Sequence, residues 1–186
     1  GEHRISGLRT QTSADSLSRG DFDLIVIAVK SYDTAHAMRA VAHVVDETTL
    51  VCSYQNGLGN VEVVAETVGW GRTVGARAIY GVWIPEPGRA DVTVMAAPTA
   101  LGVYVPEAPA ARVREIAAAM DAAGVPTVYS DVIRTVQWAK VAYNCALNPL
   151  SGLLDVTYGQ LLDTEYTRSV MREVVHELYA VAQAMN

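Results

Sequence analysis

A continuous apolar run near the start of the chain is the feature that most constrains the fold. Residues 23–29 read Asp-Leu-Ile-Val-Ile-Ala-Val, which is typical of a strand buried on both faces of a parallel sheet. A second apolar strand is predicted at about 48–54, and helices are predicted over about 33–45 and 60–68, the second capped by Asn60. This alternation of strands and helices predicts an α/β fold with a doubly wound sheet.

Shorter strands are predicted in the middle of the chain, over about 73–83, 91–96 and 100–105. Proline and glycine separate them, at 85–88 and at Pro98, which indicates a hairpin or meander.

A helix is then predicted to begin at Pro109 and to close at Gly124. One more strand, at 125–129, is predicted to end the α/β part.

From Ser130 the pattern becomes helical. Ser130 is expected to cap a helix over 131–147, which Pro149 and Gly152 interrupt, and a final amphipathic helix is predicted at about 164–185. The apolar stripe of the final helix needs a partner, so a homodimer through the helical part is one candidate assembly.

These patterns divide the chain into two parts. We predict a partial Rossmann-type nucleotide-binding domain over residues 1–129 and the beginning of an α-helical domain over 130–186.

Composition excludes several classes of protein. A net charge of −6 and a pI near 5.1 argue against a nucleic-acid binder and a basic membrane-surface protein. No apolar run approaches the roughly 20 residues of a membrane span. Cys52 and Cys145 lie in apolar runs, which predicts buried thiols and a cytoplasmic protein. The four histidines are scattered, so no metal site is expected.

Lysine is rare in this chain. Of 14 basic residues only Lys30 and Lys140 are lysine, so both are candidates for a role that needs a titratable primary amine. Lys30 follows the first apolar strand, where ligands bind in open α/β sheets. A solvated loop lysine is the alternative interpretation.

The segment Gln-Asn-Gly-Leu-Gly-Asn at 55–60 follows the second strand. Asn-Gly favours a tight turn with positive φ, which would turn Asn56 and nearby N–H groups toward the same crevice. An ordinary strand-to-helix turn is the alternative. The segment is not a dinucleotide fingerprint, because Glu62 stands where the third glycine would be.

The strongest local signal is the helix predicted over 131–147. Its faces are apolar except for one narrow polar seam. The seam consists of Gln137, Lys140, Asn144 and Asn148. An all-round apolar helix is buried, so the seam is expected to be buried or to face a cleft. There a desolvated ammonium becomes a better acid near neutral pH, and amides can hold substrate oxygens. A thin solvent-facing stripe is the alternative.

Four segments together resemble the ketopantoate reductase (2-dehydropantoate 2-reductase) family. They are AVKSYD at 28–33, QNGLGN at 55–60, the Pro-Gly turn at 87–88, and WAKVAYNCALNPLSGLL at 138–154. They occur in the family's order over nearly the whole chain. The resemblance implies an N-terminal Rossmann domain, an α-helical domain, and NADPH-dependent reduction of 2-dehydropantoate to pantoate between them.

The resemblance also implies roles for particular residues. Lys140 would be the general acid, and Asn144 and Asn148 would bind the substrate, a small anionic 2-keto acid. Lys30 and Asn56 would lie beside NADP, with Asn56 also near the substrate. Gly81 would also lie near the cofactor.

The chain departs from the family pattern in three places. The glycine-rich loop is not within this sequence, nor is the last part of the helical domain. Tyr158 stands where a further substrate-binding asparagine is expected. Reduction of another small 2-keto acid, and a non-catalytic fragment that self-associates, are therefore the alternative interpretations.

Overall fold

The computed structural model describes residues 4–185, and one five-stranded sheet organises its first part. The strands are β1 (Leu24–Ile27), β2 (Leu50–Ser53), β3 (Thr73–Glu86), β4 (Arg89–Gly102) and β5 (Thr127–Tyr129), in that spatial order. β1, β2 and β3 run parallel, β4 is antiparallel to β3, and β5 is parallel to β4.

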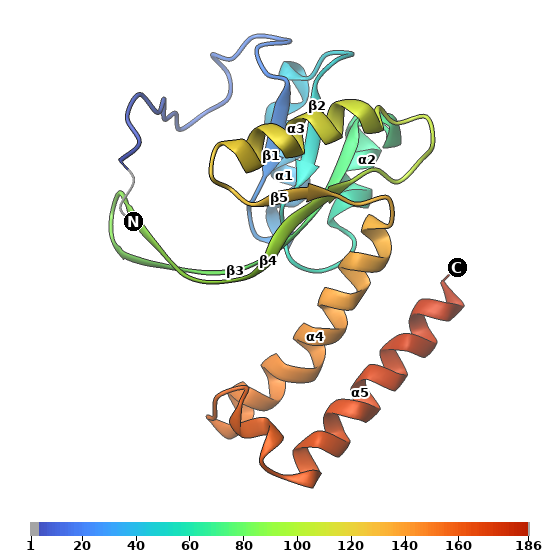
Figure 1. The fold of residues 1–186 in the computed structure, drawn as a ribbon. Coiled ribbons are helices and arrows are strands. Elements are labelled where there is room, and N and C mark those ends of the chain that lie inside the picture. Colours follow the sequence, from blue (N-terminus) through green and yellow to red (C-terminus); the bar gives the residue numbers. More distant parts are fainter. Residues whose placement is uncertain (1–3, 186) are drawn as a thin grey trace.

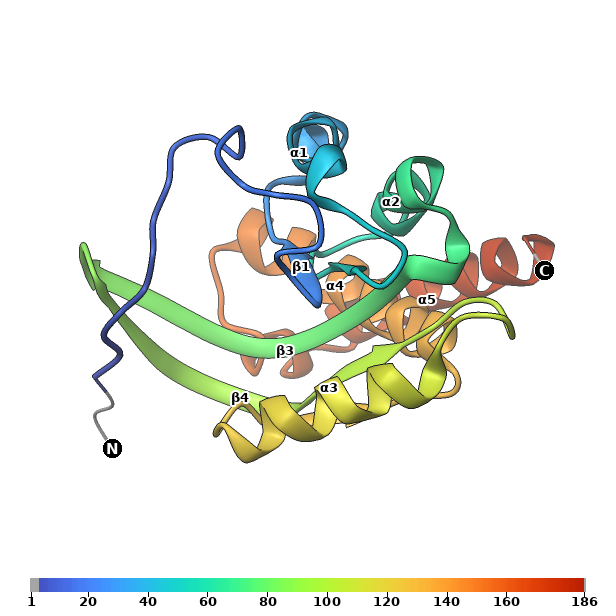
Figure 2. The ribbon, with the colours of Figure 1, turned by 90° about the horizontal axis from the view of Figure 1, so that it is seen from above.

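Helices cover both faces of the sheet. The helices are α1 (Thr34–Val41), α2 (Asn60–Val68), α3 (Ala110–Ala122), α4 (Ile133–Leu154) and α5 (Glu165–Ala184). Figure 2 shows α1 and α2 on one face and α3 on the other. This layering confirms the predicted α/β class. The predicted boundary between two domains near residue 130 stays a prediction.

Two hydrophobic cores follow from the alternation of side chains along the strands. In β2, Leu50 and Cys52 point toward α3 and contribute to a core that includes Val113. Val51, between them, contributes with Met38 to the second core, under α1 and α2. The sheet is thus held from both faces, which fixes the loops at the carboxyl ends of β1 and β2.

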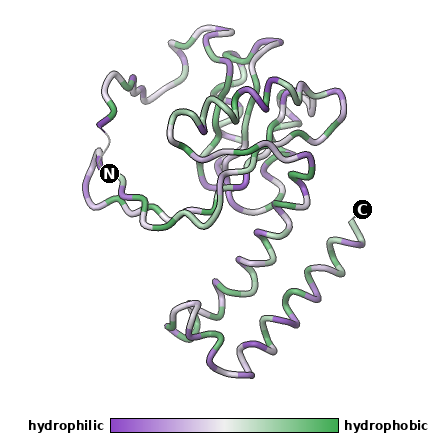
Figure 3. The backbone as a smooth tube through the Cα atoms, in the orientation of Figure 1, coloured by the Kyte–Doolittle hydropathy of each residue, from purple (hydrophilic) through white to green (hydrophobic). Residues whose placement is uncertain are grey.

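Two parts of the chain extend away from these cores. β3 and β4 continue as a long hairpin that closes at residues 86–89, and α4 and α5 form a helical hairpin (Figure 1). Hydrophobic residues occur along both extensions, outside the cores (Figure 3). Tyr166 on α5, at 87% exposed, and Trp83 on the β-hairpin, at 62%, are examples.

The prediction of separate strands at 91–96 and 100–105 is wrong, because one strand runs through Pro98. The pairing of β4 with β3 shifts at this point, from Ile79 opposite Ala97 to Arg77 opposite Ala100. A proline is tolerated at such a bulge because no ladder hydrogen bond needs its missing N–H.

The prediction that Pro149 and Gly152 interrupt the helix is also wrong. α4 continues to Leu154 and ends at Asp155, which has left-handed backbone (φ 53°) and donates its N–H to the Ser151 carbonyl. Pro149 removes one helical hydrogen bond. We attribute the continuation to packing of α4 against α5, which offsets that loss.

Two predicted helix caps and two predictions of burial also fail. Ser130 does not cap α4, whose N-cap is Val132, and Gly59 rather than Asn60 is the N-cap of α2. β1 is an edge strand with Val26 at 46% exposed, because only β2 pairs with it among the described residues. Cys52 is buried as predicted, but Cys145 is only partly buried.

Candidate active site

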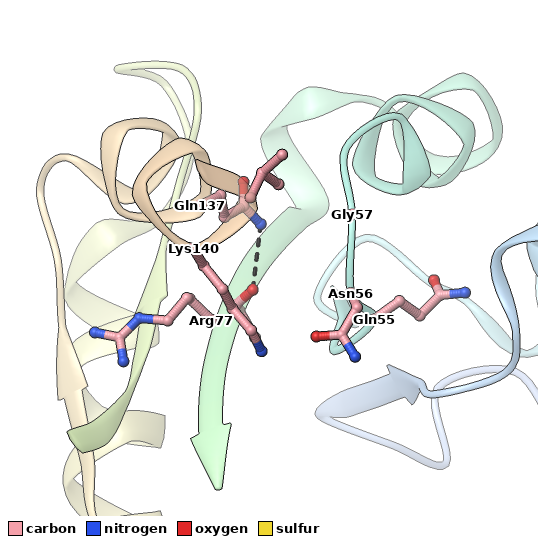
Figure 4. A pocket seen from close by; sticks show the side chains of 8 residues that line it. Gln55, Asn56, Gly57, Arg77, Gln137 and Lys140 are labelled. Carbon is pink, nitrogen blue, oxygen red and sulfur yellow. Dashed lines mark hydrogen bonds between the residues drawn. The ribbon is translucent and has the colours of Figure 1, made fainter. Parts of the chain in front are cut away.

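A small pocket lies where the start of α4 meets β3 and the loop after β2 (Figure 4). Lys140 comes from α4 and Asn56 from the loop, and their side chains converge on the space between them. The remaining lining residues are Gln55, Gly57, Ala76, Arg77, Gln137 and Val141. The fold therefore brings together two predicted site residues that are more than 80 positions apart in the sequence.

Lys140 is partly buried in this pocket. Its Nζ donates a hydrogen bond to the Ala78 carbonyl of β3, which leaves two of its three N–H groups for other acceptors. Burial lowers the pKa of Lys140 below the ordinary lysine value, and the nearby positive charge of Arg77 lowers it further. A lysine with a lowered pKa gives up its proton more readily, as a general acid near neutral pH must.

An irregularity in β3 presents the carbonyl that Lys140 uses. The register between β3 and β4 shifts between Arg77 and Ile79, so Ala78 lies at a bulge with no directly opposite partner. On the other side of β3, the pairing with β2 ends at Gly75. The Ala78 carbonyl is therefore open to a side chain from α4, as bulges beside functional sites often allow.

A buried amide holds the loop that carries Asn56. Asn60, 5% exposed, donates from Nδ2 to the Asn56 carbonyl at 3.0 Å and to Ser31 Oγ at 3.2 Å. Its Oδ1 accepts from the Thr34 hydroxyl at 3.0 Å, and Gln55 donates to the same hydroxyl oxygen at 2.8 Å. These bonds join the loop after β1 to the loop after β2.

Glycine gives the same loop its shape. Gly57 and Gly59 both have φ of 88°, a region that side chains with a Cβ rarely adopt. The Asn-Gly turn predicted from the sequence is therefore present. Neither glycine has a neighbour within 4 Å of where a Cβ would lie, so the surface of the loop is open.

The two other cofactor-binding candidates lie outside this pocket. Lys30 is exposed at the carboxyl end of β1, on the loop that Asn60 joins to the pocket. Gly81 lies in β3, and a Cβ there would meet Thr93 Oγ1 at 2.9 Å and Val94 Cγ1 at 3.1 Å. A side chain at position 81 would therefore require the Thr93 and Val94 side chains to shift.

The two asparagines of the seam differ in their surroundings. Asn144 is partly buried, one turn beyond Lys140 on α4, whereas Asn148 is exposed and accepts a hydrogen bond from the Tyr158 hydroxyl. The Tyr158 ring also packs edge-on against Tyr143, with 6.0 Å between ring centroids. Tyr158 therefore lies beside the far end of the seam.

The expectation of a wholly buried helix is only partly met. Gln137 is 9% exposed, but Val132 and Tyr143 are 60% and 50% exposed. The structure also adds Arg77 and Gln55 to the pocket. Gln55 belongs to the marked segment 55–60 but was not named as a site residue, and nothing in the sequence marked Arg77. Arg77 lies in an ordinary strand pattern, and its guanidinium donates to the Pro98 carbonyl (3.3 Å).

Residues 4–185 show neither a membrane-spanning helix nor a metal-binding cluster. These residues contain no helix with the length and apolar character that crossing a bilayer requires. Within the same range, no three histidine, cysteine, aspartate or glutamate side chains gather in a way that could hold a metal ion.

The fold and the pocket together define a class. A layered α/β sheet, polar loops at the carboxyl ends of parallel strands and a lysine on the adjoining helix are typical of dinucleotide-fold enzymes with a second, helical domain. The chain matches the family model for ketopantoate reductase PanE/ApbA over residues 3–105, and the model for its C-terminal domain over 132–186. It belongs to the ketopantoate reductase PanE/ApbA family of oxidoreductases.

Named relatives agree with this assignment. The 2-dehydropantoate 2-reductase of Aquifex aeolicus is 35% identical over 161 residues, 87% of this chain and 52% of that protein. The enzyme of the same name from Pyrococcus horikoshii is 33% identical over 93% of this chain and 56% of its own length. The chain thus spans about half the length of the curated relatives it matches.

A solved structure supports the fold directly. The crystal structure of 2-dehydropantoate 2-reductase from Geobacter metallireducens superposes with a TM-score of 0.78 at 28% identity, covering 87% of this chain and 53% of that one.

Proposed function

We propose that the protein reduces 2-dehydropantoate to pantoate with NADPH, and that Lys140 is the proton donor. The observation that carries this proposal is the convergence of Lys140 and Asn56 on one pocket at the carboxyl end of the sheet. Membership of the ketopantoate reductase family supports the reaction class, and relatives named 2-dehydropantoate 2-reductase support the substrate.

The chemistry of the two loops fits a dinucleotide. Lys30 offers a positive charge at the end of β1, and the open loop around Gly57 offers backbone N–H groups without side chains above them. We assign Lys30 and Asn56 to holding the cofactor, with Gly81 near it. The bound cofactor supplies the hydride that reaches the keto carbon of the substrate.

Lys140 completes the reduction on the oxygen side. As negative charge develops on the keto oxygen, an N–H of the Lys140 ammonium donates to it and transfers its proton, which leaves a hydroxyl group on the product and a neutral amine on the protein. The Asn56 amide, on the opposite wall, is placed to orient the substrate. Asn144 and Asn148 bind its remaining oxygens.

Reduction of a different small 2-keto acid is the second candidate. Tyr158 favours it, because a tyrosine ring stands at the far end of the seam and its hydroxyl already donates to Asn148. A homodimer through the helical part belongs to the proposal as well, since α5 exposes Tyr166 and Val170 among other apolar residues.

Oxidation of NADPH by the natural full-length protein tests the proposed function. We expect the 340 nm absorbance to fall when 2-dehydropantoate is added, with one pantoate formed for each NADPH consumed. Pyruvate and 2-ketoisovalerate, in parallel reactions, separate the two candidates by their kcat/KM. A protein that consumes NADPH with none of the three would not be a 2-keto acid reductase of this kind.

A further inference from the structure

Tyr104, in the loop after β4, makes a contact with α4 that the proposed reaction does not use. Its hydroxyl donates to Gln137 Oε1 at 2.6 Å, and Gln137 is almost fully buried. The Tyr104 ring packs against Trp70, with 5.3 Å between centroids, and the Arg134 guanidinium lies 5.5 Å from its centroid. The Tyr104 side chain is therefore held through both its hydroxyl and its ring.

Gln137 connects Tyr104 to β3. Its Nε2 donates to the Ala76 carbonyl at 3.2 Å, as Figure 4 shows, and Lys140, one turn further along α4, donates to the Ala78 carbonyl. Two side chains of α4 thus bind the carbonyls of Ala76 and Ala78, in the part of β3 beyond Gly75 where the pairing with β2 has ended.

We propose that Tyr104 and Gln137 are positioning residues for Lys140. They hold the first turns of α4 on β3, so that the Lys140 ammonium reaches the bulge at Ala78 and the pocket rather than solvent. This inference rests on the proposed function, because it assigns Lys140 as the acid. Neither residue needs to touch the substrate, and Tyr104 does not line the pocket.

Gly75 shows how closely Tyr104 is seated. A Cβ added at Gly75 would lie 2.0 Å from the Tyr104 hydroxyl oxygen and 2.7 Å from Cζ, so the phenol packs directly on the backbone of β3. Burial also raises the pKa of Tyr104 above the usual tyrosine range, which keeps the hydroxyl protonated and able to donate.

Tyr104→Phe in the natural full-length protein tests the inference. The ring and its packing remain, but Gln137 Oε1 loses its donor. We expect kcat to fall about five- to fiftyfold, since small misplacements of a catalytic group are costly, while the Kd of NADPH stays the same. The high-pH limb of the kcat profile should move to higher pH, because a less firmly held Lys140 becomes more hydrated.

A matched control variant and a double-mutant cycle distinguish a positioning role from general destabilisation of the protein. Tyr129→Phe removes a phenol hydroxyl for which the described structure shows no hydrogen bond, and it should leave kcat and the pH limb unchanged. Gln137→Met should resemble Tyr104→Phe, and the double variant should be no worse than either single one, because the residues act as one chain. Circular dichroism and Tm confirm folding of each variant.

Two results would overturn the inference while leaving the proposed function intact. The first is a Tyr104→Phe protein that keeps wild-type kcat. The second is a lower kcat with an unmoved pH limb and additive effects in the double variant, which would indicate a structural role only. A wild-type protein without 2-keto acid reduction would instead contradict the proposed function.

Discussion

Lys140→Ala is expected to lower kcat/KM by about 10²–10⁴-fold, the range over which general acid catalysis contributes. The variant removes the only lysine that lines the described pocket, and no other lining side chain there can both carry and release a proton near neutral pH. Steady-state rates with 2-dehydropantoate measure the loss, and NADPH fluorescence titration should show little change in cofactor affinity.

Two lysine variants make this prediction specific. Lys140→Arg retains the charge but removes a titratable amine, so it should also be severely impaired. Lys30→Ala, at the only other lysine, should raise the KM for NADPH with a much smaller effect on kcat. Equal rates for wild type and Lys140→Ala would remove Lys140 from the mechanism.

Asn144→Ala is expected to raise the KM for the keto acid about ten- to hundredfold. Asn144 is partly buried one turn from Lys140, where it can donate to the substrate carboxylate, and a hydrogen bond to a charged group contributes about 1.5–3 kcal/mol. The Kd of NADPH, from fluorescence titration, should not change.

Asn148→Ala is the matched control for that variant. Asn148 is exposed, and its Oδ1 already accepts from Tyr158, so its loss should raise KM less than the loss of Asn144. An Asn144→Ala protein with unchanged KM would place the substrate elsewhere than along the seam.

The α/β architecture was predictable because a buried strand appears in the sequence as a run of consecutive apolar residues. The apolar run that became β2 is buried throughout, and its alternate side chains supply both cores. The helix over 60–68 was predictable from the turn before it. These patterns depend on local order alone, so they need no knowledge of which segments meet.

The errors arose where tertiary packing outweighs a local signal. Pro149 normally ends a helix, yet α4 continues because α5 packs along it. Asparagine is a common N-cap residue, yet the Asn60 amide is buried and joins two loops. In both cases the decisive partner lies more than a dozen residues away in the sequence.

The site was predictable only in part, for the same reason. Lys140 was marked by the scarcity of lysine and by its polar seam, and Asn56 by its turn. The bulge at Ala78 depends on the register between β3 and β4, which no local pattern specifies. Arg77 lines the pocket, and Tyr104 contacts Gln137 beside it, only because that register brings β3 and the loop after β4 to the start of α4.

The pH dependence of kcat/KM with 2-dehydropantoate is the most direct test of Lys140 as the proton donor. The acid must be protonated, so the rate should be level at low pH and fall tenfold per unit above the Lys140 pKa. That fall should begin below the ordinary lysine value because of burial and Arg77. Arg77→Gln should move it to higher pH. The assignment would be contradicted if the fall in kcat/KM at high pH occurs at the same pH in Arg77→Gln as in the wild type, or if it persists in Lys140→Ala.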